Sequence, residues 1–300
     1  MISPGAYIRT MPGPETHPCP ACKKPAKVRS RYCSRCGKIL DRARISLPVA
    51  LILAALIDAY DSAADAFRCY YTGALLDTNN PKSPFYLVFD HLDPGQNKVV
   101  ACARVINEMK KDLLEKEFRI VVSALSDHME NGTPFDPYCI GFEKWKRAPI
   151  PITVGRNPLR RVPSGCHVCG GTRLKGGWYC ARCRPLVRGG CHDNKIRETA
   201  LLNALDQKRN GFICRYTHVL LDDRAPKRPY SVSFDHRIPG RPEQVVCAYF
   251  VNCMKTNLTD VEFRAVLQEL TNHWRLGTPF DTGVIDARRF ARASARRPVS

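Results

Sequence analysis

The sequence contains one pattern twice, and this internal repeat limits the chain to folds that can be built from two similar modules. In each half, two Cys-x-x-Cys pairs are separated by ten residues, and a Phe-Asp-His triplet and an Asn-x-x-Lys pattern follow them. A chain of 300 residues is long enough for two domains of ordinary size. We therefore expect an α+β protein that is internally duplicated.

The cysteines of the Cys-x-x-Cys pairs have the spacing of structural zinc ligands. One pair places two thiolates on a tight turn, and a second pair completes a closed tetrahedral shell. Disulfides or unliganded thiols are the alternatives. We predict two structural Zn²⁺ ions, held by Cys19, Cys22, Cys33 and Cys36, and by Cys166, Cys169, Cys180 and Cys183.

Two features of the sequence concern its compartment. The first residues lack a basic segment followed by an apolar stretch, so we expect no secretory signal and reduced thiols. The longest apolar run, residues 47–57, is shorter than the roughly 18 to 20 residues that span a bilayer. We predict that this run forms a buried helix capped by Ser46. An intracellular protein, cytoplasmic or nucleus-associated and without a transmembrane segment, is indicated.

The charge of the chain favours a polyanionic partner. The formal net charge is +19, with 21 basic and 16 acidic side chains in residues 1–150, and 26 and 12 in residues 151–300. Lysine and arginine displace the counterions that condense on a phosphate backbone. We predict nucleic-acid contacts near the cysteine sets, where a merely solvated surface is the alternative. The residues expected to make these contacts are Lys23, Lys24, Arg31 and Arg182.

Each half also has the order of elements expected for a ββα unit. Short strands end at the triplets, Pro-Gly turns follow, and residues 99–101 and 244–246 are predicted to return as second strands. A helix then carries the Asn-x-x-Lys pattern, and a longer amphipathic helix closes the half. The expected segments are a first zinc knuckle at 1–45, a first ββα module at 46–136, a linker at 137–164, a second knuckle at 165–190, a second module at 191–281 and a basic tail at 282–300, which either aids solubility or contacts phosphate.

The repeated polar residues have the composition of a centre for phosphodiester hydrolysis, which needs a base for water and a cation for the developing charge. A carboxylate and a carboxamide in each half offer oxygen ligands to Mg²⁺ or Mn²⁺. The candidate ligands are Asp90 and Asn107, and Asp235 and Asn252; the candidate general bases are His91 and His236; the lysines expected to contact phosphate are Lys110 and Lys255. Since duplication also copies scaffolding, the alternative is that these residues only hydrogen-bond a turn.

The order of C-x-x-T, F-D-H, a Pro-Gly turn, V-x-C, N-x-M-K-x-x-L and E-F resembles the HNH nucleases of the His-Me finger (ββα-metal) superfamily. The resemblance covers residues 67–125 and 212–270. It implies the same roles for the aspartates, histidines and asparagines, and cleavage that leaves 5′-phosphate and 3′-hydroxyl ends. The N of the name HNH stands for an asparagine between the two histidine positions. Asn97 is available for this position in the first half, but Pro242 replaces it in the second.

The favoured prediction is therefore a metal-dependent DNA endonuclease of restriction, homing or junction-resolving type. One polypeptide would act as a monomeric pseudo-dimer with two active sites. The preference for DNA over RNA comes only from the resemblance. The alternative is a zinc-containing nucleic-acid-binding protein with one active site, which would make it a nickase, or with none. The complete Asp, His and Asn sets favour the enzyme, because a binding protein has no use for a base beside an oxygen-rich metal site.

Overall fold

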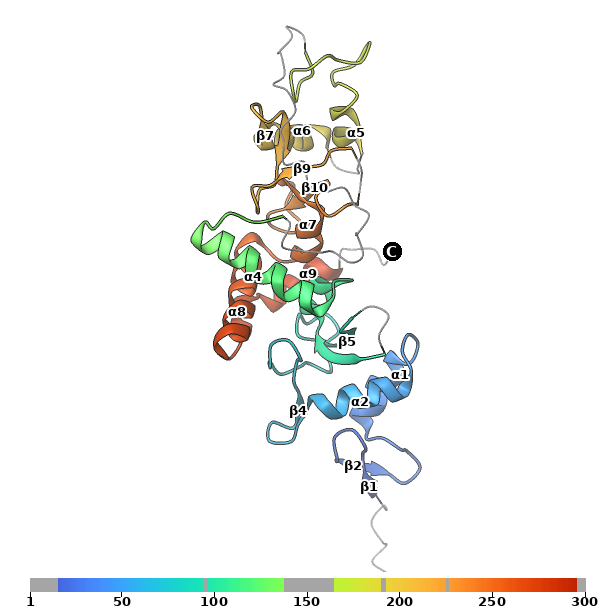
Figure 1. Cartoon of the computed structure of the whole chain (residues 1–300). Helices are drawn as coiled ribbons and strands as arrows, with labels where there is room; N and C mark the ends of the chain where they lie inside the picture. Colours follow the sequence, from blue (N-terminus) through green and yellow to red (C-terminus); the bar gives the residue numbers. More distant parts are fainter. Residues whose placement is uncertain (1–15, 94–96, 138–164, 190–192, 225–226, 296–300) are drawn as a thin grey trace, which may run out of the picture.

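The computed structural model describes residues 16–93, 97–137, 165–189, 193–224 and 227–295. Within these ranges helices and short antiparallel strand pairs are mixed, as expected for the α+β class. In both halves a helix at the cysteine set is followed by a second helix, short strands, a hairpin and two further helices (Figure 1). Within the described residues, a strand pair in 16–27 precedes this order only in the first half, and a helix at 287–295 follows it only in the second. The predicted linker lies outside the described residues apart from Pro137.

A two-stranded hairpin followed at once by a short helix forms the centre of each half. In the first half, β5 (Leu87–His91) pairs antiparallel with β6 (Val99–Ala103), and α3 (Arg104–Lys110) follows. In the second half, β10 (Val232–His236) pairs with β11 (Gln244–Ala248), and α7 (Tyr249–Lys255) follows. The predicted strand, strand and helix are therefore present in both halves.

Smaller elements support these hairpins from the amino-terminal side. Helix α2 (Val49–Ala59) contacts β6, and helix α6 (Asn194–Ala204) contacts β11. Helices α1 (Ser34–Ala43) and α5 (Cys183–Arg188) each begin within a cysteine set. The remaining strands are β1 (Thr16–Pro18), β2 (Pro25–Lys27), β3 (Tyr60–Asp61), β4 (Ala66–Phe67), β7 (Leu205–Asp206), β8 (Gly211–Ile213) and β9 (Leu220–Leu221).

Two long helices join the halves. Helix α4 (Glu115–Asn131) contacts α8 (Asp260–Leu276), and α3 contacts α7. Each long helix ends at a glycine with positive φ, Gly132 or Gly277, a conformation that glycine adopts without the steric cost of a Cβ atom. Figure 1 shows α4 and α8 in the middle of the molecule, with α1 and α2 at one end and α5 and α6 at the other.

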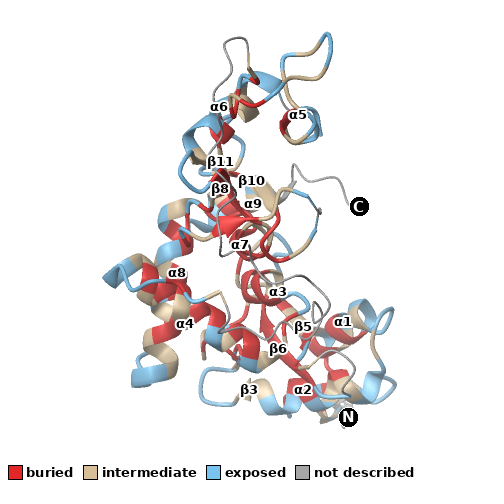
Figure 2. Cartoon of the chain, turned by 45° about the horizontal axis from the view of Figure 1, so that its top comes forward, coloured by how far each residue is buried: buried red, intermediate tan, exposed pale blue. Residues whose placement is uncertain are grey.

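Equivalent positions in the two halves make equivalent contacts across this junction. The guanidinium of Arg119 lies 4.8 Å from the centre of the Trp274 ring, and Arg264 donates to the carbonyl of Met129 at 3.4 Å. Arg264 and Met129 stand 145 positions from Arg119 and Trp274. Corresponding elements of the two halves therefore face each other, and buried residues run continuously from one half into the other (Figure 2).

Two local expectations were wrong. Pro48, not Ser46, is the N-cap of α2, and the hydroxyl of Ser46 instead contacts the carbonyl of Ala43 at 3.3 Å. The end of the described chain is not merely a basic tail, since α9 (Ala287–Ala295) follows a 3₁₀ turn, η2 (Thr282–Val284), and buries Phe290 completely. No helix in the described ranges has the length and apolar character needed to cross a membrane.

Candidate metal clusters and strand-end centres

The two sets of cysteines converge as zinc ligands would. In each set the four sulfur atoms lie within 4.8 Å of one another. The Sγ atoms of Cys22 and Cys33 are 3.5 Å apart, and those of Cys169 and Cys180 are 3.6 Å apart. Zn–S bonds of about 2.3 Å in a tetrahedron require sulfur separations of about 3.8 Å, whereas a disulfide requires about 2.05 Å. The thirteen cysteines in the described ranges are free thiols, so both clusters fit a metal ion such as zinc.

The surroundings of the thiols differ within each cluster. Burial raises the pKa of Cys19, but hydrogen bonds from backbone amides, with Cys33 first, lower it overall to about 7. Hydrogen bonding with Cys183 lowers the pKa of Cys169 to about 5. Burial raises the pKa of Cys36. Each cluster therefore contains one thiol that loses its proton readily. The resulting thiolate is the form of cysteine that binds a metal ion.

In the first half, Asp90 lies in a buried polar centre. It is 5% exposed, and its Oδ2 atom accepts a 2.6 Å hydrogen bond from the hydroxyl of Tyr71. The ammonium of Lys110, with 0% exposure, lies 3.1 Å from the same oxygen and donates to the backbone carbonyl of His91 at 2.8 Å. Burial raises the pKa of Asp90, and the hydrogen bond from Tyr71 and the charge of Lys110 oppose this rise. The lysine therefore fixes the end of the strand that carries the histidine.

The second half repeats this centre with one additional carboxylate. The Lys255 ammonium lies 2.9 Å from Asp235 Oδ2 and donates to the carbonyl of His236 at 2.8 Å. The hydroxyl of Tyr216 lies 2.5 Å from Asp235 and 2.7 Å from Asp260. Burial raises the pKa of Asp235, opposed first by the charge of Lys255. We call these two groups, Tyr71–Asp90–Lys110 and Tyr216–Asp235–Lys255, the strand-end centres.

As arranged, each strand-end centre pairs its aspartate with a buried ammonium, which disfavours a divalent ion at the same carboxylate. Asp90 is balanced by the fully buried ammonium of Lys110. The fully buried ammonium of Lys255, in contrast, is shared between Asp235 and Asp260. An ion bound to Asp90 would lie close to the Lys110 ammonium in a medium that screens charge poorly. The same placement differs from the expectation that Lys110 and Lys255 contact phosphate, since neither side chain reaches the surface.

The two asparagines lie on the helices that face these strands. In the second half, the Asn252 side-chain amide donates to Ser233 Oγ at 2.8 Å and to the Phe234 carbonyl at 3.3 Å. These contacts hold the carboxamide beside the middle of β10, two residues before Asp235. Asn107 is half-buried at the equivalent place on α3. In the second half, the Asn252 carboxamide and the Asp235 side chain thus lie between β10 and α7.

The strand-end histidines point away from the buried centres, and they differ between the halves. His91 is exposed, whereas His236 is half-buried. The Nδ1 atom of His236 lies 2.5 Å from the carbonyl of Arg241, so Nδ1 carries the proton in that contact. Its Nε2 atom lies 3.1 Å from the amide nitrogen of Gln244, and with the proton on Nδ1 the Gln244 amide donates to Nε2. Position 99, the equivalent of Gln244, is a valine, which has no such group.

The cations predicted to bind nucleic acid fall into two groups. Lys23 and Arg31 are exposed beside the first cluster. Lys24 is also exposed but forms an ion pair with Asp65. Arg182 has a structural role, because its side chain is 15% exposed, pairs with Asp223 and donates to Asn210 at 2.8 Å.

The sequence interpretation missed Tyr71, Tyr216 and Gln244. The two tyrosines stand 145 positions apart, so the repeat itself was a usable signal. Gln244 has no repeat partner of its own type and could be found only from the strand register, which places it opposite His236.

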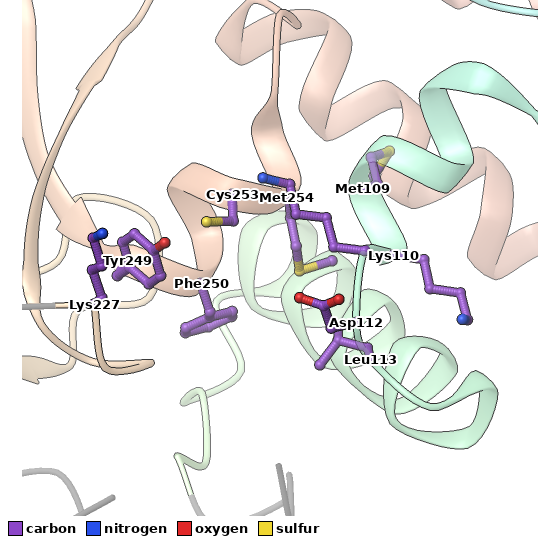
Figure 3. Close-up of a pocket in the computed structure, with 10 residues that line it drawn as sticks. Met109, Lys110, Asp112, Leu113, Lys227, Tyr249, Phe250, Cys253 and Met254 are labelled. Atoms are coloured by element: carbon purple, nitrogen blue, oxygen red, sulfur yellow. The ribbon is translucent and has the colours of Figure 1, made fainter. Parts of the chain in front are cut away.

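A cavity of about 300 Å³ lies at the junction of the halves, between α3 and α7. Figure 3 shows its walls, which include Met109 and Leu113 from the first half and Phe250 and Met254 from the second. Lys110 is also drawn there, although its ammonium is bound to Asp90. The cavity therefore belongs to the packing of the two halves.

The chain was also compared with known proteins. No family model matches it, and neither a curated protein nor a solved structure is similar enough to count as a match.

Proposed function

We propose that this chain is a nucleic-acid-binding protein made of two HNH-like ββα modules that arose by duplication. The observation that carries the proposal is the placement of the cysteine clusters. The elements that hold them, β1, β2 and α1 in one half and α5 in the other, lie at opposite ends of the molecule (Figure 1). DNA is the proposed partner because of the HNH resemblance, and RNA is the alternative.

Exposed cations surround both clusters. Lys23, Lys27, Arg29 and Arg31 are exposed at the first cluster. Lys175, Arg184 and Arg188 are exposed at the second. A molecule with a basic surface at each end can neutralise phosphates at two separate places on one nucleic acid. Metal at each cluster would hold these surfaces in shape, because the clusters are otherwise built from short loops.

The test is a salt titration of duplex DNA binding, followed by fluorescence anisotropy. The triple variant Lys23→Ala, Lys27→Ala, Arg29→Ala should bind at least about tenfold more weakly and lower the slope of log K against log salt by up to about 2.7. A matched triple variant removes exposed cations elsewhere, at Lys82, Lys116 and Arg292. Equal losses in both triple variants would mean that binding follows net charge and that the clusters are not the contact surface.

Phosphodiester hydrolysis by an HNH-type mechanism is a second candidate, and the exposure of His91 favours it. An accessible imidazole at the end of the first strand can take a proton from water. The paired aspartates place this candidate second, because a divalent ion that stabilises the phosphorane charge would have to compete with a buried ammonium for the carboxylate. Both ring nitrogens of His236 have contacts, with the Arg241 carbonyl and the Gln244 amide, which makes the second half the weaker candidate for a general base.

Supercoiled plasmid with Mg²⁺ or Mn²⁺ tests this candidate. Wild-type protein and the His236→Ala variant should both produce nicked circles, whereas His91→Ala should produce none. Linear product that needs both histidines would restore the prediction of two active sites. If the plasmid stays intact at every protein concentration, hydrolysis is refuted and nucleic-acid binding is the only proposed function that remains.

A further inference from the structure

Trp178 is a tryptophan that the fold leaves in solvent. It lies in the loop between the two cysteine pairs of the second cluster and is 62% exposed, the largest value for an aromatic side chain within the described ranges. Tryptophan is usually well buried, because its large apolar surface is stabilised by leaving water. Its exposure here leaves much of the ring available to a ligand.

The loop holds this indole in one place. The backbone amide of His167 donates to the carbonyl of Trp178 at 3.1 Å, and the two rings meet edge to face at 4.7 Å. The amide of Leu174 donates to the carbonyl of Tyr179 at 3.1 Å. The hydroxyl of Tyr179 donates to Glu198 on α6 at 2.9 Å. The exposed ring thus stands on a fixed support, and binding would require little ordering of the loop.

Positive charge lies on the same cluster. Lys175 is exposed three residues before Trp178, and Arg184 is exposed at the start of α5. An exposed aromatic ring and cations on the same cluster are the combination by which proteins hold single strands, because bases stack on the ring while the cations contact the phosphate backbone. A hydrophobic protein partner would not need this charge.

We propose that the Trp178 indole stacks on an unpaired nucleobase, so that the second cluster binds single-stranded or locally opened nucleic acid. This inference rests on the proposed function and adds the substrate class. The matching position at the first cluster is Arg31, whose guanidinium lies 5.8 Å from the ring centre of Tyr32. The two ends therefore differ, and only the second offers an open indole.

The experiment compares the wild type, Trp178→Ala and Trp178→Phe with labelled oligothymidylate, oligouridylate and a duplex of matched length. Trp178→Ala should weaken binding of the single strands by about tenfold and change duplex affinity by less than about twofold, since one stacked base contributes that much. Trp178→Phe should recover part of the loss. The affinities for oligothymidylate and oligouridylate, compared with each other, show whether the stacked base belongs to DNA or to RNA.

Each further outcome has one meaning. Wild-type protein that binds duplex, with single-strand affinity unchanged in Trp178→Ala, would overturn the stacking role and leave the proposed function intact. Wild-type protein that binds no nucleic acid would overturn both. A dimer that dissociates in Trp178→Ala, seen by light scattering, would assign the indole to self-association and also overturn the proposal. Equal zinc content in all three proteins serves as the folding control.

Discussion

The indole Nε1–H of Trp274 donates a 2.8 Å hydrogen bond to the backbone carbonyl of Tyr71, although 203 positions separate the two residues. The side chain of Tyr71 in turn donates to Asp90. The closing helix of the second half therefore supports the strand-end centre of the first. Met129 occupies the equivalent place on α4 and has no indole with which to return the contact.

Trp274→Ala should therefore lower the free energy of unfolding by about 2 to 4 kcal/mol, because it removes packing, the hydrogen bond and the contact with Arg119. Met129→Ala is the matched control. It should also lower the free energy of unfolding, by about 1 to 2 kcal/mol less than Trp274→Ala does. Urea unfolding followed by circular dichroism measures both. Equal costs would show that the two sides of the junction contribute alike.

The buried ion pair predicts a strong non-additive effect. Asp90→Asn leaves the Lys110 ammonium buried without a counter-charge, and Lys110→Met leaves the carboxylate unbalanced. Each should cost about 3 to 5 kcal/mol, while the double variant should cost clearly less than the sum. A double-mutant cycle by urea unfolding measures the coupling. Additive losses would contradict the pairing, and stabilisation of the wild type by added Mg²⁺ that Asp90→Asn abolishes would return Asp90 to the role of metal ligand.

The cysteine clusters predict two zinc ions per chain. Cys22→Ser and Cys169→Ser should each retain one ion, because each leaves the other cluster intact. Metal analysis by mass spectrometry after exhaustive dialysis gives the ratio. One ion in the wild type, or two in either variant, would refute the assignment for at least one cluster.

The sequence predicted the parts whose physical cause is local. The hairpins and the helices after them follow from strand propensity, Pro-Gly turns and helical periodicity, and the clusters follow from Cys-x-x-Cys geometry. The prediction that Ser46 caps the helix was wrong because the helix begins after Pro48. A proline has no amide hydrogen and therefore favours the cap or the first turn of a helix.

The strand-end centres could not be predicted in the same way, because burial decides the role of a charged side chain. An aspartate, a histidine and a lysine in one repeat suit a metal site as well as a buried ion pair. Only the packing of α3 on β5 places Lys110 against Asp90 and leaves His91 outside. Helix α9 was not predicted because its sequence is rich in arginine, and a single large apolar side chain, Phe290, packs into the core.

His218 makes the contact between the halves sensitive to acid. Its ring lies 5.1 Å from that of His128, and burial, followed by the charges of His128 and Arg215, lowers the pKa of His218 below its usual 6.5. The unfolded chain therefore binds a proton at a higher pH than the folded chain does. Stability from this site is full above about 6.5 and is lost as the pH falls toward the folded pKa.

His218→Gly should remove this part of the pH dependence. The equivalent residue in the first half is Gly73, and the φ of +55° at His218 also suits glycine. Urea midpoints measured between pH 7.5 and 5 should fall less in the variant than in the wild type. Parallel curves would assign the acid sensitivity to other groups.

Gln244 should control access to the imidazole of His236. Its side chain, 7% exposed, lies against Nε2 of His236, which is half-buried, whereas the strand register places Val99 opposite His91, which is exposed. Diethyl pyrocarbonate acylates an accessible imidazole nitrogen, so the wild type should be modified faster at His91 than at His236. Gln244→Val should raise the rate at His236, and Val99→Gln should lower the rate at His91, by roughly tenfold in each case if one hydrogen bond is exchanged. Peptide mass spectrometry over time reports both sites in one sample, independently of any cleavage activity. An unchanged rate at His236 in Gln244→Val would mean that the glutamine does not restrict this histidine, and the argument that the second half is the weaker candidate for a general base would then fail.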